Sequence, residues 1–110
     1  MGKKIKCIVK RAGEAVGHVT WISDTLRNLQ TQVDGPIETV TICRNPRVVM
    51  ICNEEGKLCG DLQPHFFFGL DRIYGDVVVC GQDGDKFADV PITLDAWRMF
   101  LKKSGNDIGR

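Results

Sequence analysis

The sequence lacks the features that mark DNA-binding, membrane and secreted proteins. Its net charge at pH 7 is only +1, from 15 basic and 14 acidic residues, whereas duplex-DNA binders are usually strongly basic because phosphate neutralisation dominates their affinity. No apolar run approaches the roughly 20 residues that span a bilayer. Residues 1–10 alternate polar and apolar instead of forming the apolar region of a signal peptide. We therefore expect a cytoplasmic protein with no membrane contact and no specific nucleic acid partner.

The cysteines show no pairing. There are 5 of them and no C-x-x-C motif, whereas disulfide frameworks and zinc sites show paired spacing. Cys7, Cys43, Cys52 and Cys80 lie among isoleucines and valines, where a free thiol behaves as a small hydrophobic side chain, and Cys59 follows a polar turn. The sequence predicts reduced, structural cysteines, and we expect neither a metal nor a cofactor.

Internal repeats, linkers and low-complexity segments are also missing. The chain has 110 residues, of which 43% are hydrophobic and 26% are charged. Such a chain can bury one core and is too ordinary in composition for a disordered protein. We expect a single domain over residues 1–110, with frayed ends at 1–2 and 106–110.

Hydrophobic alternation predicts a sheet. Strands are expected over 3–10, 18–22, 37–43, 48–52, 76–81 and 87–90. The segment 48–52 is apolar at every position, which indicates a strand buried on both faces at the centre of the sheet. It should pair with 37–43 as an antiparallel hairpin across the turn at 44–47. Residues 58–75 are expected to be irregular.

Two segments have the periodicity of amphipathic helices. The first should begin after an N-cap at Ser23 or Asp24 and end at Gly35-Pro36, and the second should begin after Thr93. The expected inner stripes are Leu26, Leu29 and Val33 in the first helix, and Leu94, Trp97, Phe100 and Leu101 in the second. Trp21 and Trp97 are both expected in the core. The predicted fold class is α+β, a single antiparallel sheet of about 4–6 strands with two helices packed on it.

The polar turn at 53–57 is the most informative segment. It is either a plain strand connection, since asparagine, glycine and charged residues are usual there, or the rim of a binding site. Glu54 and Glu55 could accept hydrogen bonds from ribose hydroxyls or an adenine amine, and Lys57 could face a phosphate. An acid–base pair is a weaker reading, because adjacent side chains rarely point at the same atom. We predict no catalytic residue.

A second candidate segment is the aromatic run that begins at His65. Its imidazole is expected to be an exposed loop group, with ligand binding or general-base chemistry as alternatives. Phe66, Phe67 and Phe68 cannot all face one core. We expect two buried rings and one exposed ring, or else a subunit interface or a lid that stacks on a base.

Several of these motifs together resemble a known family. They are I-C-N-E-E-G-K-L at 51–58, L-R-N-L-Q at 26–30 and G-D-V-V-V-C-G at 75–81. The chain resembles, over nearly its whole length, a family of small domains of unknown function encoded by bacteriophages and other mobile elements of Firmicutes. Many relatives carry a proline-asparagine-arginine loop after the turn, where this chain has Asp61–Phe66. A function located in that loop transfers less safely.

The resemblance implies a phage accessory protein that acts in the host bacterial cytoplasm. Such a protein could counter bacterial immunity by sequestering a nucleotide-derived signal, ADP-ribose-like or cyclic, without cleaving it. Binding would use cations for the pyrophosphate, rings for the base and acids or amides for the ribose. The candidate ligand-binding residues are Asn53, Glu54, Glu55, Lys57, His65, Phe67, Arg72, Tyr74 and Arg47.

The sequence leaves the oligomeric state and two alternative functions open. Arg47 and Lys57 lie at opposite ends of a strand roughly 17 Å long, so both could touch one ligand only in a homo-oligomer, which we expect. The first alternative is a protein–protein inhibitor of a host defence enzyme of the restriction or CRISPR type. The second is a small nucleotide-processing enzyme that uses Glu54, Glu55 or His65.

Overall fold

A computed structural model of the protein describes residues 3–56 and 64–108. Its strands are β1 (Lys4–Lys10), β2 (His18–Ser23), β3 (Ile37–Arg44), β4 (Arg47–Asn53), β5 (His65–Phe68), β6 (Asp71–Tyr74), β7 (Val77–Asp83) and β8 (Lys86–Ala88). Its helices are α1 (Leu26–Val33) and α2 (Leu94–Lys103). The fold is a strand-rich α+β fold, as the sequence predicts. Neither helix has the length and apolar character needed to cross a membrane.

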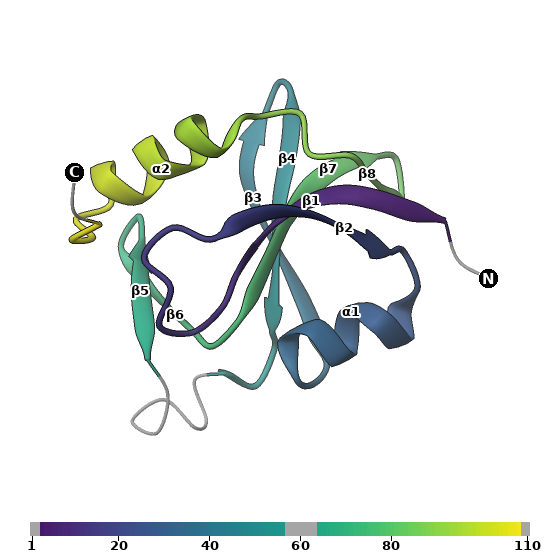
Figure 1. Ribbon diagram of the computed structural model, residues 1–110, viewed down its shortest axis with the longest axis horizontal. Coiled ribbons are helices and arrows are strands. Elements are labelled where there is room, and N and C mark those ends of the chain that lie inside the picture. The colour runs from purple at the N-terminus through teal and green to yellow at the C-terminus, as the bar shows by residue number, and fades with distance from the viewer. Residues whose placement is uncertain (1–2, 57–63, 109–110) are drawn as a thin grey trace.

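The main sheet has 6 strands in the order β2-β1-β7-β4-β3, with β8 paired to the end of β7. All pairings are antiparallel, including the predicted β3–β4 hairpin. Helix α1 lies on one face of this sheet and α2 on the other, and the β5–β6 hairpin lies on the same side as α2 (Figure 1). Within the described residues, the sheet is therefore covered by the β5–β6 hairpin as well as by the two helices that the sequence predicts.

Strands β4 and β7 are buried on both faces. In β4, Val48, Met50 and Cys52 pack towards α2 and the hairpin, whereas Val49 and Ile51 pack towards α1. Strand β7 divides in the same way, because side chains alternate between the faces of a sheet. The predicted central position of 48–52 is confirmed. Cys7, Cys52 and Cys80 are buried, Cys43 is half-buried, and Cys59 lies outside the described residues.

Helix α1 differs from the prediction at both ends. Its N-cap is Thr25, whose hydroxyl accepts from the Asn28 N–H, and not Ser23 or Asp24. Leu26 is 59% exposed, so only Leu29 and Val33 of the expected stripe are buried. At the C-terminus Asp34, and not Gly35, takes the left-handed conformation, with φ 62°. Helix α2 begins after Thr93 as predicted, and Trp97 and Leu101 are its buried residues.

The segment expected to be irregular contains the β5–β6 hairpin. Phe66 and Ile73 are buried against α2 and the sheet, Phe68 packs beside them, and Phe67 is 38% exposed. The expectation of two buried rings and one exposed ring is therefore confirmed in part, because Phe66 is buried and Phe67 exposed but Phe68 is only half-buried. The strands were missed because the hairpin is short and three consecutive phenylalanines hide the alternation of a strand.

The tryptophans have opposite environments. Trp97 has no exposed surface, and its indole Nε1 donates to the Val16 carbonyl oxygen at 2.9 Å. Trp21 is 56% exposed, so its predicted core position is wrong. It lies on the edge strand β2 opposite Lys6, also exposed, whereas the neighbouring pair of Ile5 and Ile22 faces α1. The helix α2 does not cover this corner of the sheet.

We predict that Trp97→Phe lowers the free energy of unfolding by about 1–3 kcal/mol, because the Val16 carbonyl loses its partner and the core loses ring area. Trp21→Phe is the matched control and should change it by less than about 0.5 kcal/mol. Urea unfolding followed by circular dichroism measures both. Equal losses in the two variants would contradict this assignment of the core.

Candidate functional site

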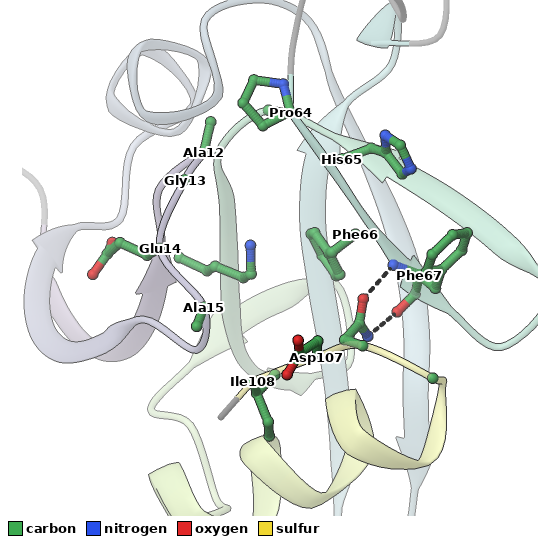
Figure 2. Close-up of a pocket in the computed structure, with 14 residues that line it drawn as sticks. Ala12, Gly13, Glu14, Ala15, Pro64, His65, Phe66, Phe67, Asp107 and Ile108 are labelled. Atoms are coloured by element: carbon green, nitrogen blue, oxygen red, sulfur yellow. Dashed lines mark hydrogen bonds between the residues drawn. The ribbon is translucent and has the colours of Figure 1, made fainter. Parts of the chain in front are cut away.

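The outer face of the β5–β6 hairpin gathers four of the predicted ligand-binding residues. Antiparallel pairing places His65 opposite Tyr74 and Phe67 opposite Arg72. The His65 ring centroid lies 5.4 Å from that of Phe67 and 5.4 Å from that of Tyr74, and the Arg72 guanidinium carbon lies 5.8 Å from the Phe67 ring. We call these four side chains the hairpin outer face. Figure 2 shows His65 and Phe67 on the opposite side of β5 from Phe66.

A cleft separates this hairpin from the polar turn after β4. It has a volume of about 220 Å³ and is lined from the turn by Asn53, Glu54 and Gly56 and from the hairpin by Arg72 and Tyr74. We call it the turn cleft. Residues about twenty positions apart in the sequence thus meet here because β6 lies beside the end of β4.

Acids outnumber cations in the turn cleft. Glu38, Glu54 and Asp71 line it, with Arg72 as the one cation among its described lining residues. Carboxylates accept hydrogen bonds from hydroxyl and amino groups, whereas they repel phosphates. The volume is below the 300 Å³ or so at which drug-sized ligands are usually enclosed. The cleft therefore suits a sugar or the edge of a base rather than a whole dinucleotide.

Asn53 has a structural role that the sequence did not reveal. Its Nδ2 donates to the carbonyl oxygens of Val33 at 3.1 Å and Asp34 at 3.0 Å, and its Oδ1 accepts from the Glu55 N–H at 2.7 Å. The amide therefore fastens the end of α1 to the end of β4, and it has only one oxygen lone pair left for a ligand. A Cβ on Gly35 would lie 2.6 Å from this Nδ2, so a larger residue there would displace the amide from its hydrogen bonds.

Two further predicted residues, Glu55 and Arg47, do not line the cleft. Glu55 is exposed and does not line it. Arg47 lies at the far end of β4, where its Nε donates to the Gln82 Oε1 at 2.8 Å. Lys57 lies outside the described residues, directly after Gly56, which lines the cleft.

A larger cavity of about 400 Å³ lies on the other side of the hairpin (Figure 2). Its walls are the β1–β2 connection, the start of β5 and the segment after α2, and its lining includes His65, Phe66 and Phe67. Lys10 also lines it, with only 5% of its surface exposed, and its Nζ lies 4.3 Å from the centroid of the Phe66 ring. We call it the lysine cavity. Sequence reasoning missed Lys10 because β1 begins with alternating lysines that read as a solvated face.

Burial dominates the electrostatics of Lys10. Desolvation lowers the pKa of its ammonium, and the charges of Glu14 and Asp76 oppose this shift without cancelling it. Both carboxylates have closer partners. A hydrogen bond from the Arg11 N–H, 2.8 Å away, lowers the pKa of Glu14, with a smaller contribution from His18. The Asp76 carboxylate lies 3.3 Å from the Arg11 guanidinium.

The segment after α2 is held against the hairpin. The Asn106 side chain accepts from the Phe67 N–H and donates to the Phe67 carbonyl, both at 2.7 Å, and it also donates to the Leu101 carbonyl at 2.8 Å. The Ser104 hydroxyl accepts from the Gly69 N–H at 3.0 Å. The tail expected to fray from residue 106 therefore begins with a residue tied to β5. These bonds fix one wall of the lysine cavity (Figure 2).

We predict that Asn53→Ala lowers the free energy of unfolding by roughly 1–3 kcal/mol, because the last carbonyls of α1 lose their donor. Glu55→Ala in the same exposed turn is the control and should change it by less than about 0.5 kcal/mol. Chemical denaturation of the three proteins measures the difference. An Asn53→Ala variant with an unchanged free energy of unfolding would show that the hydrogen bonds of this side chain make no net contribution to stability.

We predict that Lys10→Met raises the melting temperature near neutral pH, because the folded state no longer holds a buried charge. The pKa of Lys10 is lower in the folded protein than in the unfolded chain. Between these two pKa values the unfolded chain binds more protons than the folded protein, so the wild type becomes more stable as pH rises. The advantage of the variant should therefore shrink as pH rises towards about 10.4, the unfolded pKa of lysine. Lys6→Met, at an exposed position of β1, should show neither effect.

Comparison with known proteins gives a family and no function. No curated protein and no solved structure matches the chain significantly. A family described as a domain of unknown function, DUF3846, matches residues 5–101. The match runs from β1 to α2 and includes the main sheet, both helices and the β5–β6 hairpin. The chain therefore belongs to the DUF3846 family of domains of unknown function.

Proposed function

We propose that this protein binds and sequesters a nucleotide-derived ligand, ADP-ribose-like or cyclic, without cleaving it, and that it thereby counters a bacterial immune signal. The observation that carries the ligand class is the hairpin outer face, where the His65 ring contacts those of Phe67 and Tyr74 and Arg72 lies over Phe67, beside an acid-lined cleft. The immune context comes from the resemblance of the sequence to phage-encoded domains.

Each part of a nucleotide has a matching group there. A base can stack on the Phe67 or Tyr74 ring, since aromatic stacking does not depend on the identity of the base. The Arg72 guanidinium can hold a phosphate through paired hydrogen bonds. Glu54 and Glu38, which line the turn cleft, can accept from the ribose hydroxyls. In this arrangement the base would contact a ring of the hairpin outer face, the phosphate would contact Arg72, and the ribose would contact the glutamates of the turn cleft.

The arrangement favours holding a ligand over cleaving it. The catalytic alternative requires His65 and a glutamate to act on the same bond. The His65 ring instead contacts Phe67 and Tyr74, and His65 is not among the residues that line the turn cleft with Glu54. The rings around His65 restrict its rotation, which lowers the entropy lost when a base stacks beside it.

We predict that the protein depletes ADP-ribose or a cyclic dinucleotide from solution, and that heat denaturation then returns the ligand intact, as chromatography would show. Tyr74→Ala should weaken binding roughly 5- to 150-fold, the range expected for loss of one stacked base. Arg72→Ala should weaken it as well. Arg47→Ala removes a cation at the far end of β4 and is the matched control, with unchanged binding.

The outcomes separate the alternatives. A chemically altered ligand would favour the enzyme, and no depletion of any nucleotide would refute sequestration. Equal effects of Arg47→Ala and Arg72→Ala would show that the hairpin outer face is not the site. Melting temperatures of all variants, measured in parallel, exclude loss of fold as the cause.

A further inference from the structure

We propose that the lysine cavity is a second ligand site, which binds a small organic anion with its carboxylate or phosphate on Lys10 Nζ and its apolar body against Phe66. His65 and Phe67 line this cavity as well as belonging to the hairpin outer face, but Lys10 and Phe66, which carry the proposal, do not line the turn cleft. The cavity volume of about 400 Å³ lies within the range usual for enclosed small molecules.

The first argument is the position of the ammonium. Lysines are almost never buried unless they are paired, yet Lys10 is 5% exposed. Its Nζ faces the Phe66 ring at 4.3 Å, and no carboxylate or carbonyl within residues 3–56 and 64–108 accepts a hydrogen bond from it. An ammonium has three N–H donors, and an aromatic face satisfies its charge without accepting conventional hydrogen bonds. Donors therefore remain for a ligand.

The second argument is that the acids near the ammonium are engaged with other groups, including Asp107, which lines the cavity and has an interaction of its own. The Glu14 carboxylate accepts from the Arg11 N–H and lies 3.3 Å from His18 Nδ1. Asp76 contacts the Arg11 guanidinium at 3.3 Å and accepts from the Ala12 N–H at 2.6 Å. Figure 2 shows the Glu14 side chain directed away from Phe66. The ammonium therefore stays in the cavity instead of closing an ion pair with either acid.

The third argument is that hydrogen bonds and ring packing hold the walls in place. The Asn106 side chain is hydrogen-bonded to both the N–H and the carbonyl of Phe67. The Trp97 indole bonds the Val16 carbonyl, and its ring packs edge-on against Phe66 at 6.3 Å between centroids. A preformed cavity requires little ordering when a ligand enters, which leaves more of the contact energy for affinity.

The fourth argument is that the charge of Lys10 lowers the stability of the folded protein. Replacing a buried charge by an apolar residue of similar size is often neutral or stabilising. Burial lowers the pKa of Lys10, so the charged ammonium opposes folding where it lies. A cation kept where it opposes folding is expected if a ligand supplies the missing partner.

The test uses benzoate and phenyl phosphate as probes, with benzamide as the neutral isostere of benzoate. We expect one or both anions to produce saturable amide shifts at Phe66 and at residues 12–15 in two-dimensional NMR spectra of the full chain, and benzamide to produce none. A response to benzoate alone assigns a carboxylate ligand, and a response to phenyl phosphate alone assigns a phosphate.

Protein variants complete the test. Lys10→Met should weaken binding roughly 10- to 100-fold, the loss expected for a charged hydrogen bond. Lys6→Met, at an exposed lysine of the same strand, should bind as the wild type does, and so should Glu54→Gln, which alters only the turn cleft. The proposal is overturned if neither anion gives saturable shifts, if benzamide binds as well as benzoate, or if Lys10→Met retains affinity while its spectrum shows a native fold.

Discussion

The burial of β4 and β7 on both faces is the constraint on which the rest of the structure depends. Two adjacent strands without a polar face must be covered from both sides, because burial of apolar surface is the main term that stabilises the fold. Helix α1 covers one face, and α2 with the β5–β6 hairpin covers the other. Both cavities lie where the hairpin meets its neighbours, so the need to cover the sheet also positions the candidate sites.

The hairpin serves the core and the surface with the same few residues. Alternation along each strand directs Phe66 and Ile73 inwards and His65, Phe67, Arg72 and Tyr74 outwards. The inward rings fix the hairpin to α2, and the outward rings form the surface that we assign to a nucleotide. Because the core holds the hairpin in place, the outward groups need little reorganisation to bind.

Two asparagine side chains hold the covering elements where they are. Asn53 joins the end of α1 to the end of β4, and Asn106 joins the segment after α2 to β5. Each amide supplies donors and an acceptor in one plane, so it can satisfy main-chain groups that no helix or sheet partner reaches. One fixes a wall of the turn cleft and the other a wall of the lysine cavity. Polar residues near a candidate site are therefore not all available to a ligand.

The sequence by itself determined the composition class, the strands of the main sheet, both helices and the central place of 48–52, because these follow from local periodicity and from apolar content. It also singled out Glu54, Arg72 and Tyr74, but not their meeting in one cleft. The hairpin at 65–74 was hidden by its short strands, and Trp21 was assigned to a core that its edge strand does not reach. Only the tertiary structure decided that Asn53 is a fastening residue, that Arg47 lies apart and that Lys10 is buried. Burial and hydrogen-bond partners depend on which distant segments cover a residue, and alternation along one strand carries no information about that cover.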